Sequence, residues 1–208
     1  LVNISCRDRN LIAIQADLLA AWAFNLRSVV ALTGDAVSVG DSPDRKGVFE
    51  VNSIRLLNAI AVLNSGRDLA GNELKGKPDF AAVVVNPNAN NTNAELKRLK
   101  RKKEAGALYA LSQPVFEEES SQNFFQAAKE VGMPIMMGLL PLKSLKAAEA
   151  IVKIPGIKVS DGIKARLSSL GSADLSSFFL QHCLELARLN RELVSGFHVV
   201  SGATPLLA

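Results

Sequence analysis

The chain has 208 residues, 48% of them hydrophobic, and a formal net charge of +4. This composition predicts a soluble globular protein with a core of its own, and the length suits a single domain over residues 1–208. No apolar run approaches the roughly 20 residues that a membrane helix needs, so neither a membrane contact nor a signal peptide is predicted.

Short apolar runs alternate with longer helical segments along almost the whole chain, which is typical of a parallel sheet with crossover helices. We predict six strands, over residues 2–6, 29–33, 80–86, 108–113, 134–138 and 197–201. Seven helices are predicted over residues 10–24, 52–63, 91–105, 121–131, 144–152, 160–170 and 173–195. The first helix is apolar nearly all round, so we expect it to be deeply buried.

Several predicted strands end in small or polar residues. Thr33, Gly34 and Asp35 follow one apolar run, Asn86 follows another, and Ser112 and Gln113 end a third. Because α/β enzymes keep their chemistry at the carboxyl ends of parallel strands, these groups could face one shared site. The loop at 36–46 follows a strand and is predicted to be functional or mobile, whereas the loop at 64–79 joins a helix to a strand and lies on the opposite face.

Six strands with intervening helices fit either an open doubly wound sheet or most of a (β/α)8 TIM barrel. Polar residues at many strand ends favour the barrel. A whole barrel takes about 250 residues, so we expect one or two N-terminal βα units to be missing from this chain. We also expect an N-terminal extension, a partner subunit or a second copy to cover the exposed sheet edge.

The segment 97–103 contains six basic residues in seven, a density that could indicate nucleic-acid binding. It lies within a predicted helix with a capping box at Thr92 and Glu95 and an apolar stripe at Leu96 and Leu99. We therefore favour a solvated helix face, part of which can reach a phosphate, and predict no nucleic-acid partner.

Cysteine and histidine use predicts neither disulfides nor a metal site. Cys6 and Cys183 are too few for a disulfide framework and suit a reducing compartment, so we expect a cytoplasmic protein. His182 and Cys183 are adjacent, so on a helix their side chains diverge by about 100° and cannot bind one ion together.

Motifs spread along nearly the whole chain resemble the 5,10-methylenetetrahydrofolate reductase family, especially the reductase half of bifunctional homocysteine methyltransferase/methylenetetrahydrofolate reductase proteins. They lie at residues 3–10 (NISCRDRN), 32–35 (LTGD), 39–41 (VGD), 47–51 (GVFEV), 86–88 (NPN), 95–107 (ELKRLKRKKEAGA), 112–116 (SQPVF) and 138–142 (GLLPL). The resemblance implies a (β/α)8 barrel that binds FAD, accepts hydride from NAD(P)H and reduces methylenetetrahydrofolate to 5-methyltetrahydrofolate in the one-carbon metabolism that feeds methionine biosynthesis.

The resemblance also implies roles for particular residues. Asp35 is the candidate for a catalytic role near flavin and folate, and its alternative is a helix cap or turn aspartate. Gln113 is the second candidate folate ligand, because its amide can donate and accept, and its alternative is to satisfy loop backbone. The positions that match FAD contacts are Asn3, Ser5, Thr33, Gly34, Asp35, Phe49, Glu50, Glu95, Arg98, Arg101 and Lys102. Arg101 and Lys102 are expected to neutralise the pyrophosphate.

The resemblance places the family's catalytic glutamate on the first barrel strand, which is not among these 208 residues. An alternative therefore stays open: a non-catalytic barrel that binds flavin or folate, or a partner subunit that lacks the catalytic acid.

Overall fold

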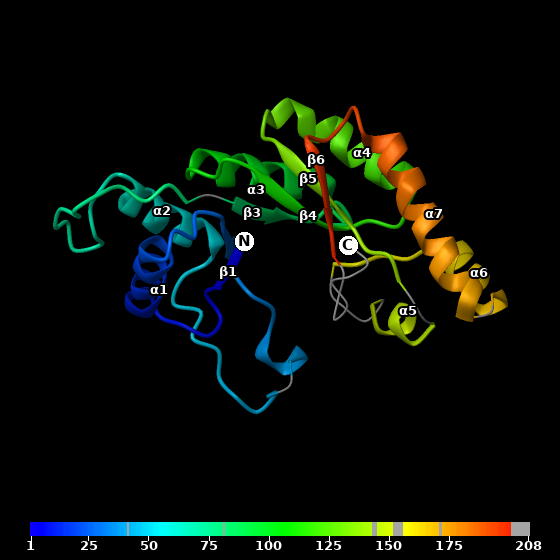
Figure 1. Ribbon diagram of the computed structural model, residues 1–208, viewed down its shortest axis with the longest axis horizontal. Coiled ribbons are helices and arrows are strands. Elements are labelled where there is room, and N and C mark those ends of the chain that lie inside the picture. The colour runs from blue at the N-terminus through cyan, green and yellow to red at the C-terminus, as the bar shows by residue number, and fades with distance from the viewer. Residues whose placement is uncertain (41, 81, 143–144, 152–155, 171, 201–208) are drawn as a thin grey trace. The chain divides into compact units, whose positions relative to one another are not determined.

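The computed structural model describes residues 1–40, 42–80, 82–142, 145–151, 156–170 and 172–200. Its sheet is parallel, and its strands follow one another in chain order: β1 (Val2–Ser5), β2 (Val29–Leu32), β3 (Ala82–Val85), β4 (Ala110–Pro114), β5 (Ile135–Leu139) and β6 (Gly196–Val199) (Figure 1). A doubly wound sheet reverses its strand order at a switch point, whereas consecutive βα units of a TIM barrel do not. The strand order therefore confirms the α/β class and decides between the two predicted architectures in favour of barrel connectivity.

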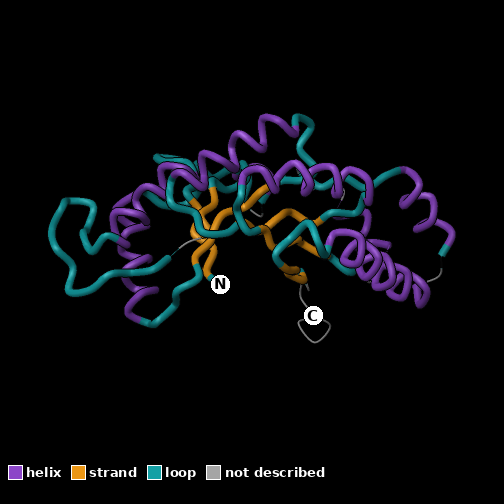
Figure 2. The backbone as a smooth tube through the Cα atoms, turned by 90° about the horizontal axis from the view of Figure 1, so that it is seen from above, coloured by secondary structure: helices purple, strands orange, loops and turns teal. Residues whose placement is uncertain are grey.

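Helices separate the strands along the chain. Figure 2 distinguishes the helices from the strands by colour. The helices are α1 (Leu11–Ala23), α2 (Ser53–Asn64), α3 (Thr92–Glu104), α4 (Glu118–Ala128), α5 (Leu145–Ile151), α6 (Asp161–Ser169) and α7 (Ser172–Asn190), with short 3-10 turns at Val37–Val39 and Lys129–Val131. Each predicted strand and helix thus overlaps an observed element of the same type in the described part of the chain, although the bounds differ by a few residues. Parts of three predictions, at residue 81 of one strand, residues 144 and 152 of a helix and residue 201 of another strand, lie outside those residues.

Two predicted helix boundaries were wrong for local reasons. The helix predicted from residue 121 begins at Glu118, because Glu118 and Glu119 occupy its first turn, where carboxylates interact favourably with the helix dipole. The helix predicted to reach residue 195 ends at Asn190, because the N–H groups of Leu193 and Val194 both turn back to the Asn190 carbonyl.

The described chain forms two compact units, one of residues 1–84 with 100–109 and one of residues 85–99 with those from 110 onward. In the first unit, β1 and β2 pair from Val2 opposite Val29 to Ser5 opposite Leu32. Ile4 and Cys6 of this region are buried, whereas Asn3, on the other face of β1, is exposed. The alternation of a half-buried strand thus turns a polar side chain toward the face opposite the apolar core.

Helix α1 is only partly buried, so its predicted deep burial was wrong. Asn10 caps the helix by accepting a hydrogen bond from the Ala13 N–H, and Ile14 and Leu18 are fully buried. Ile12 is 78% exposed, because a helix that contacts its unit along one side leaves the opposite side in solvent however apolar it is.

In the second unit, an aromatic core joins the end of β4 to α7. Phe116 and Phe179 meet edge to face with ring centroids 6.3 Å apart, and Leu140, Leu142 and Leu175 pack around them. Helices α4 and α7 lie side by side in this unit (Figure 1). Burial of each such side chain contributes about 1.5–3 kcal/mol, and this packing holds the carboxyl ends of β4 and β5 in place.

Candidate active site

The carboxyl ends of β1 and β2 meet at Gly34. This residue has φ of +89°, and a Cβ there would lie 2.5 Å from Ser5 Oγ and 2.7 Å from Arg7 Cβ. Glycine is therefore required both by the left-handed backbone and by the close approach to β1. The tight turn leaves Asp35 exposed immediately after the strand.

Arg7 and Asp8 form an exposed ion pair beside this turn, with Nε and Oδ1 2.7 Å apart. The pKa of Arg7 is raised, chiefly by the hydrogen bond to Asp8 and to a smaller extent by the charge of Asp35. The pKa of Asp8 is lowered, chiefly by the same hydrogen bond. The carboxylate of Asp35 therefore lies in a region that already contains a paired guanidinium.

Two other predicted FAD contacts in this unit interact with helix N-termini. Thr33 Oγ1 accepts a hydrogen bond from the Ser53 N–H at 3.1 Å, at the start of α2. Glu50 Oε2 accepts one from the Leu11 N–H at 2.7 Å, at the start of α1. Each side chain satisfies an N–H that has no partner within its helix, so both have a structural role in the fold.

Phe49 lies on the loop that returns to the end of β1. Its N–H donates to the Cys6 carbonyl at 3.1 Å, its φ is +42°, and its side chain is 41% exposed. A Cβ on Gly47 would clash with the Phe49 ring, so this glycine gives the ring room. An exposed aromatic ring held this way is available to stack on a planar ligand.

Glu95 of α3 is 3% exposed and connects its helix to the end of β3. Its Oε1 accepts a hydrogen bond from the Asn86 N–H at 3.0 Å, and its Oε2 pairs with Arg98 Nη1 at 2.7 Å. The predicted capping box was wrong, because Asn91 caps the helix by accepting from the Ala94 N–H at 2.9 Å. The Glu95 carboxylate accepts a hydrogen bond from the Asn86 N–H instead of taking part in a capping box.

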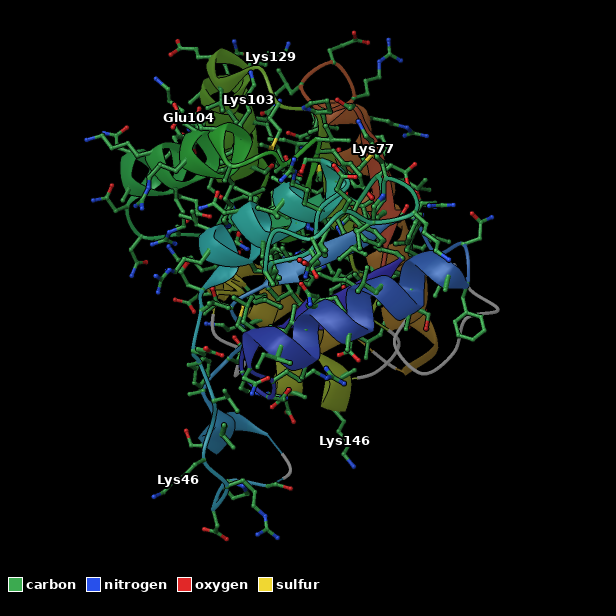
Figure 3. All side chains as sticks on the ribbon, turned by 90° about the vertical axis from the view of Figure 1, so that its left-hand side faces the viewer. Lys46, Lys77, Lys103, Glu104, Lys129 and Lys146 are labelled. Carbon is green, nitrogen blue, oxygen red and sulfur yellow. The ribbon has the colours of Figure 1, made fainter. Side chains whose placement is uncertain are left out.

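The basic run of α3 divides into buried and exposed side chains. Lys102 is 7% exposed, and its Nζ donates to the Val84 carbonyl at 2.5 Å. Arg101 is exposed, as are Lys103 and Glu104 at the end of the helix (Figure 3). Arg101 can therefore reach a ligand in solvent, whereas the ammonium of Lys102 is bound to β3.

Gln113 lies near the carboxyl end of β4 and is half-buried. The backbone next to it is held by Asn88, whose Nδ2 donates to the carbonyls of Pro114 at 2.9 Å and Gly156 at 3.0 Å. Asn88 is buried and was not predicted as a site residue. The signal available in the sequence was its position directly after a predicted strand.

The two units contribute different candidates. The first unit brings Ser5 and Gly34 into contact and carries the predicted residues Asn3, Thr33, Asp35, Phe49, Glu50, Arg101 and Lys102. The second carries Glu95, Arg98 and Gln113.

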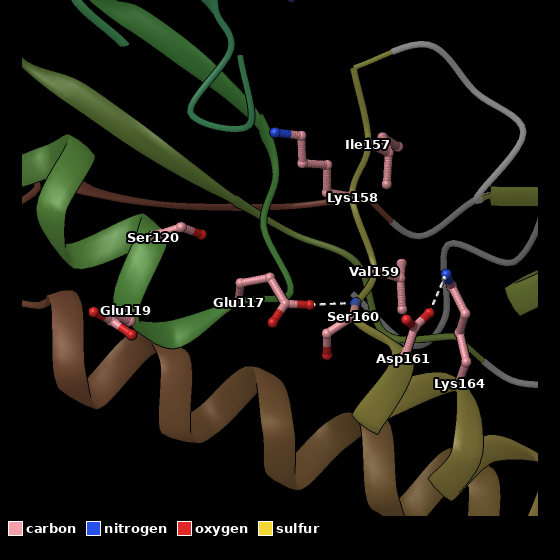
Figure 4. A pocket seen from close by; sticks show the side chains of 9 residues that line it. All are labelled: Glu117, Glu119, Ser120, Ile157, Lys158, Val159, Ser160, Asp161 and Lys164. Carbon is pink, nitrogen blue, oxygen red and sulfur yellow. Dashed lines mark hydrogen bonds and ion pairs between the residues drawn. The ribbon is translucent and has the colours of Figure 1, made fainter. Parts of the chain in front are cut away.

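A pocket of about 630 Å³ in the second unit contains none of the predicted site residues (Figure 4). Glu117 Oε1 accepts a hydrogen bond from the Ser160 N–H at 2.5 Å, and Lys164 pairs with Asp161 at 2.9 Å. Its lining consists of Glu117, Glu119, Ser120, Ile157, Lys158, Val159, Ser160, Asp161 and Lys164. Figure 4 shows these two interactions, Glu117 with Ser160 and Asp161 with Lys164, at the start of α6.

Neither cysteine is set up as a nucleophile. Burial raises the pKa of the Cys6 thiol to about 11, and it raises that of Cys183 to about 11 as well. Across the described ranges, no three His, Cys, Asp or Glu side chains are grouped so as to hold a metal ion. In the same part of the chain, every helix is too short or too polar to cross a membrane.

The strand order and the polar residues that follow the strands define an α/β protein of the TIM-barrel class. The family model described as methylenetetrahydrofolate reductase matches residues 1–201. The chain belongs to this family, which confirms the resemblance seen in the motifs.

Curated relatives are about a quarter identical to this chain over the residues that align. A probable methylenetetrahydrofolate reductase (NADPH) of Caenorhabditis elegans is 26% identical over 90% of this chain and 28% of its own length. The 5,10-methylenetetrahydrofolate reductases of Pectobacterium carotovorum and Escherichia coli are 23% and 25% identical over 94% and 76% of this chain. The chain spans between 28% and 62% of the length of these relatives.

A solved structure of a Clostridium thermocellum protein, described as binding two copies of 5-methyl-5,6,7,8-tetrahydrofolic acid, aligns with a TM-score of 0.45 and 15% identity. The alignment covers 99% of this chain and 89% of that one. A similarity this low informs neither the fold nor the ligand of the present chain.

Proposed function

We propose that this chain belongs to a flavin-dependent enzyme that reduces 5,10-methylenetetrahydrofolate to 5-methyltetrahydrofolate with NAD(P)H. The observation that supports it most is the family match over residues 1–201. Asp35 and Gln113, the residues proposed to bind folate, follow or end parallel strands, where enzymes of this class bind their substrates.

Asp35 and Gln113 would recognise folate by complementary hydrogen bonding. A carboxylate only accepts, so Asp35 would bind the N–H groups of the pterin and influence the electronics of a nearby flavin. The amide of Gln113 both donates and accepts, so it fits a pterin or a nicotinamide edge. Asp35 is not proposed as the proton donor.

The residues of the first unit fit an FAD in part. Asn3, Asp35, Phe49 and Arg101 are exposed and chemically suited to polar, aromatic and phosphate groups. Ser5, Thr33, Glu50 and Lys102 each bind a backbone group of the protein, so any contact from them would share that group. In the second unit, Arg98 is 58% exposed while paired with Glu95, and its remaining N–H groups suit a pyrophosphate. Bound FAD would supply hydride transfer between NAD(P)H and the methylene carbon of the folate.

Absorbance of the purified protein tests the proposal. We expect bound flavin or uptake of added FAD, bleaching by NADH or NADPH without oxygen, and recovery of the oxidised spectrum on addition of methylenetetrahydrofolate. Asp35→Asn should slow this recovery by about 10-fold or more, since a charged hydrogen bond is lost. Asp44→Asn, at an exposed position of the loop at 36–46, is the matched control and should not.

Failure to bind any flavin would refute the proposal. Flavin bleaching without any recovery by methylenetetrahydrofolate would reject the folate assignment and favour the non-catalytic barrel.

A further inference from the structure

Strand β4 contains a register shift between Leu111 and Pro114, the segment that includes Gln113. Leu111 pairs with Met136 and Pro114 with Gly138, so three steps along β4 match two along β5. One extra residue is therefore inserted in β4, which is the definition of a β-bulge. Pro114 fits this position, because proline has no N–H to give to a regular ladder.

A bulge leaves backbone groups without their usual partners, and Ser112 supplies one replacement. Its Oγ accepts a hydrogen bond from the Gly138 N–H at 2.9 Å and donates to the Gln113 carbonyl at 2.9 Å. The side chain is 2% exposed, so water cannot readily substitute for it. The Ser112 hydroxyl thus takes the place of a ladder carbonyl and also fixes the peptide that follows Gln113.

His198 supplies the second replacement, from β6. Its Nε2 lies 2.9 Å from the Ser112 carbonyl, and it donates there in the tautomer that carries the Nε2 proton. The ring must pass over β5 at Gly138, where a Cβ would lie 3.0 Å from His198 Nε2 and 2.6 Å from the Ser112 carbonyl. Glycine at 138 therefore lets a side chain of β6 reach the backbone of β4.

We propose that Ser112, Gly138 and His198 form a clamp that holds the bulge of β4 and thereby positions the amide of Gln113 for its ligand. Ser112 and His198 are positioning residues that act through Gln113. Because a one-residue change of register turns a strand's side chains to its other face, loss of the clamp would redirect Gln113. The choice of folate as the ligand rests on the proposed function; the clamp itself does not.

Hydrogen exchange of the Gly138 amide tests the clamp without any ligand. In Ser112→Ala the amide loses its acceptor, and we expect its exchange to accelerate by about 10-fold or more. Ser121→Ala is a matched control, because Ser121 is 1% exposed and its hydroxyl likewise donates to a carbonyl, of Glu118, and accepts from Asn190. It should lower stability while leaving Gly138 exchange unchanged.

Calorimetry with 5-methyltetrahydrofolate on the flavin-loaded protein tests the action through Gln113. We expect Ser112→Ala and His198→Leu each to weaken binding by about 5-fold or more, and His198→Gln, which keeps an N–H donor, to weaken it less. In a Gln113→Ala background, Ser112→Ala should have no further effect. If Ser112→Ala does not fold, His198→Leu carries the same test.

Unchanged Gly138 exchange in Ser112→Ala would overturn the clamp. Equal weakening by Ser112→Ala with and without Gln113 would overturn the action through Gln113. If the wild-type protein binds no folate, the proposed function fails, and a crystal structure of Ser112→Ala still decides the inference: a Gln113 side chain in its original position refutes it, and a redirected one supports it.

Discussion

Replacing Gly34, after the end of β2, by alanine should destabilise the protein in two ways, through backbone strain and through steric overlap. The backbone φ of +89° is unfavourable for any residue with a Cβ, and the new methyl group would lie 2.5 Å from Ser5 Oγ and 2.7 Å from Arg7 Cβ. Gly71 is a matched control, because its φ is +91° and a Cβ there would meet nothing within 4 Å. Gly71→Ala therefore carries the backbone cost alone.

The left-handed backbone costs an alanine about 1–2 kcal/mol. Overpacking adds about 1–3 kcal/mol where neighbours cannot move away, and Arg7 Cβ is attached directly to the backbone two residues beyond the end of β1. We expect Gly71→Ala to lower the free energy of unfolding by about 1–2 kcal/mol and Gly34→Ala by about 2–5 kcal/mol. An extra 2 kcal/mol corresponds to a Tm lower by about 4–8 °C for a chain of this size.

Urea titration of both variants beside the wild type measures the difference, provided that the slopes agree. Equal losses for Gly34→Ala and Gly71→Ala would refute the close approach of Gly34 to β1. If the residues around Gly34 also bind flavin, Gly34→Ala should lose flavin at temperatures where the protein remains folded, and Gly71→Ala should retain it.

Three further predictions concern buried groups. Asn88→Ala should lower the free energy of unfolding by about 2–3 kcal/mol, because the carbonyls of Pro114 and Gly156 lose their donor. Asn72→Ala, in an exposed loop, should lower it by less than about 1 kcal/mol, and equal losses in urea would contradict the burial of Asn88. Glu95→Ala should lower the free energy of unfolding by about 2–3 kcal/mol. Glu95→Gln should lower it by only about 1 kcal/mol, since glutamine can still accept from the Asn86 N–H and Arg98 is largely in solvent; a larger loss would show that the ion pair with Arg98 dominates. With a pKa of about 11, about one thousandth of each thiol is ionised at pH 8. Iodoacetamide should therefore label Cys6 and Cys183 slowly in the native protein and rapidly in urea, and rapid labelling of the native protein would contradict the burial of these thiols.

The sequence by itself determined the number and order of the strands and helices, and the family. Buried parallel strands need continuous apolar runs such as Val29 to Leu32, and the alternation of such runs with amphipathic segments depends only on local pattern. The same pattern located Asp35 and Gln113 at strand ends.

Tertiary structure alone decided what each polar side chain contacts. Glu95 was available for a capping box, but the Asn86 N–H at the end of β3 lies close enough to bind it. Lys102 and Arg101 are neighbours in one basic run, yet only Lys102 points at the Val84 carbonyl. The clamp around Gln113 joins Ser112, Gly138 and His198 from three strands, and it depends on a register shift that no local periodicity encodes, because hydrogen bonds between distant segments exist only once the sheet has formed.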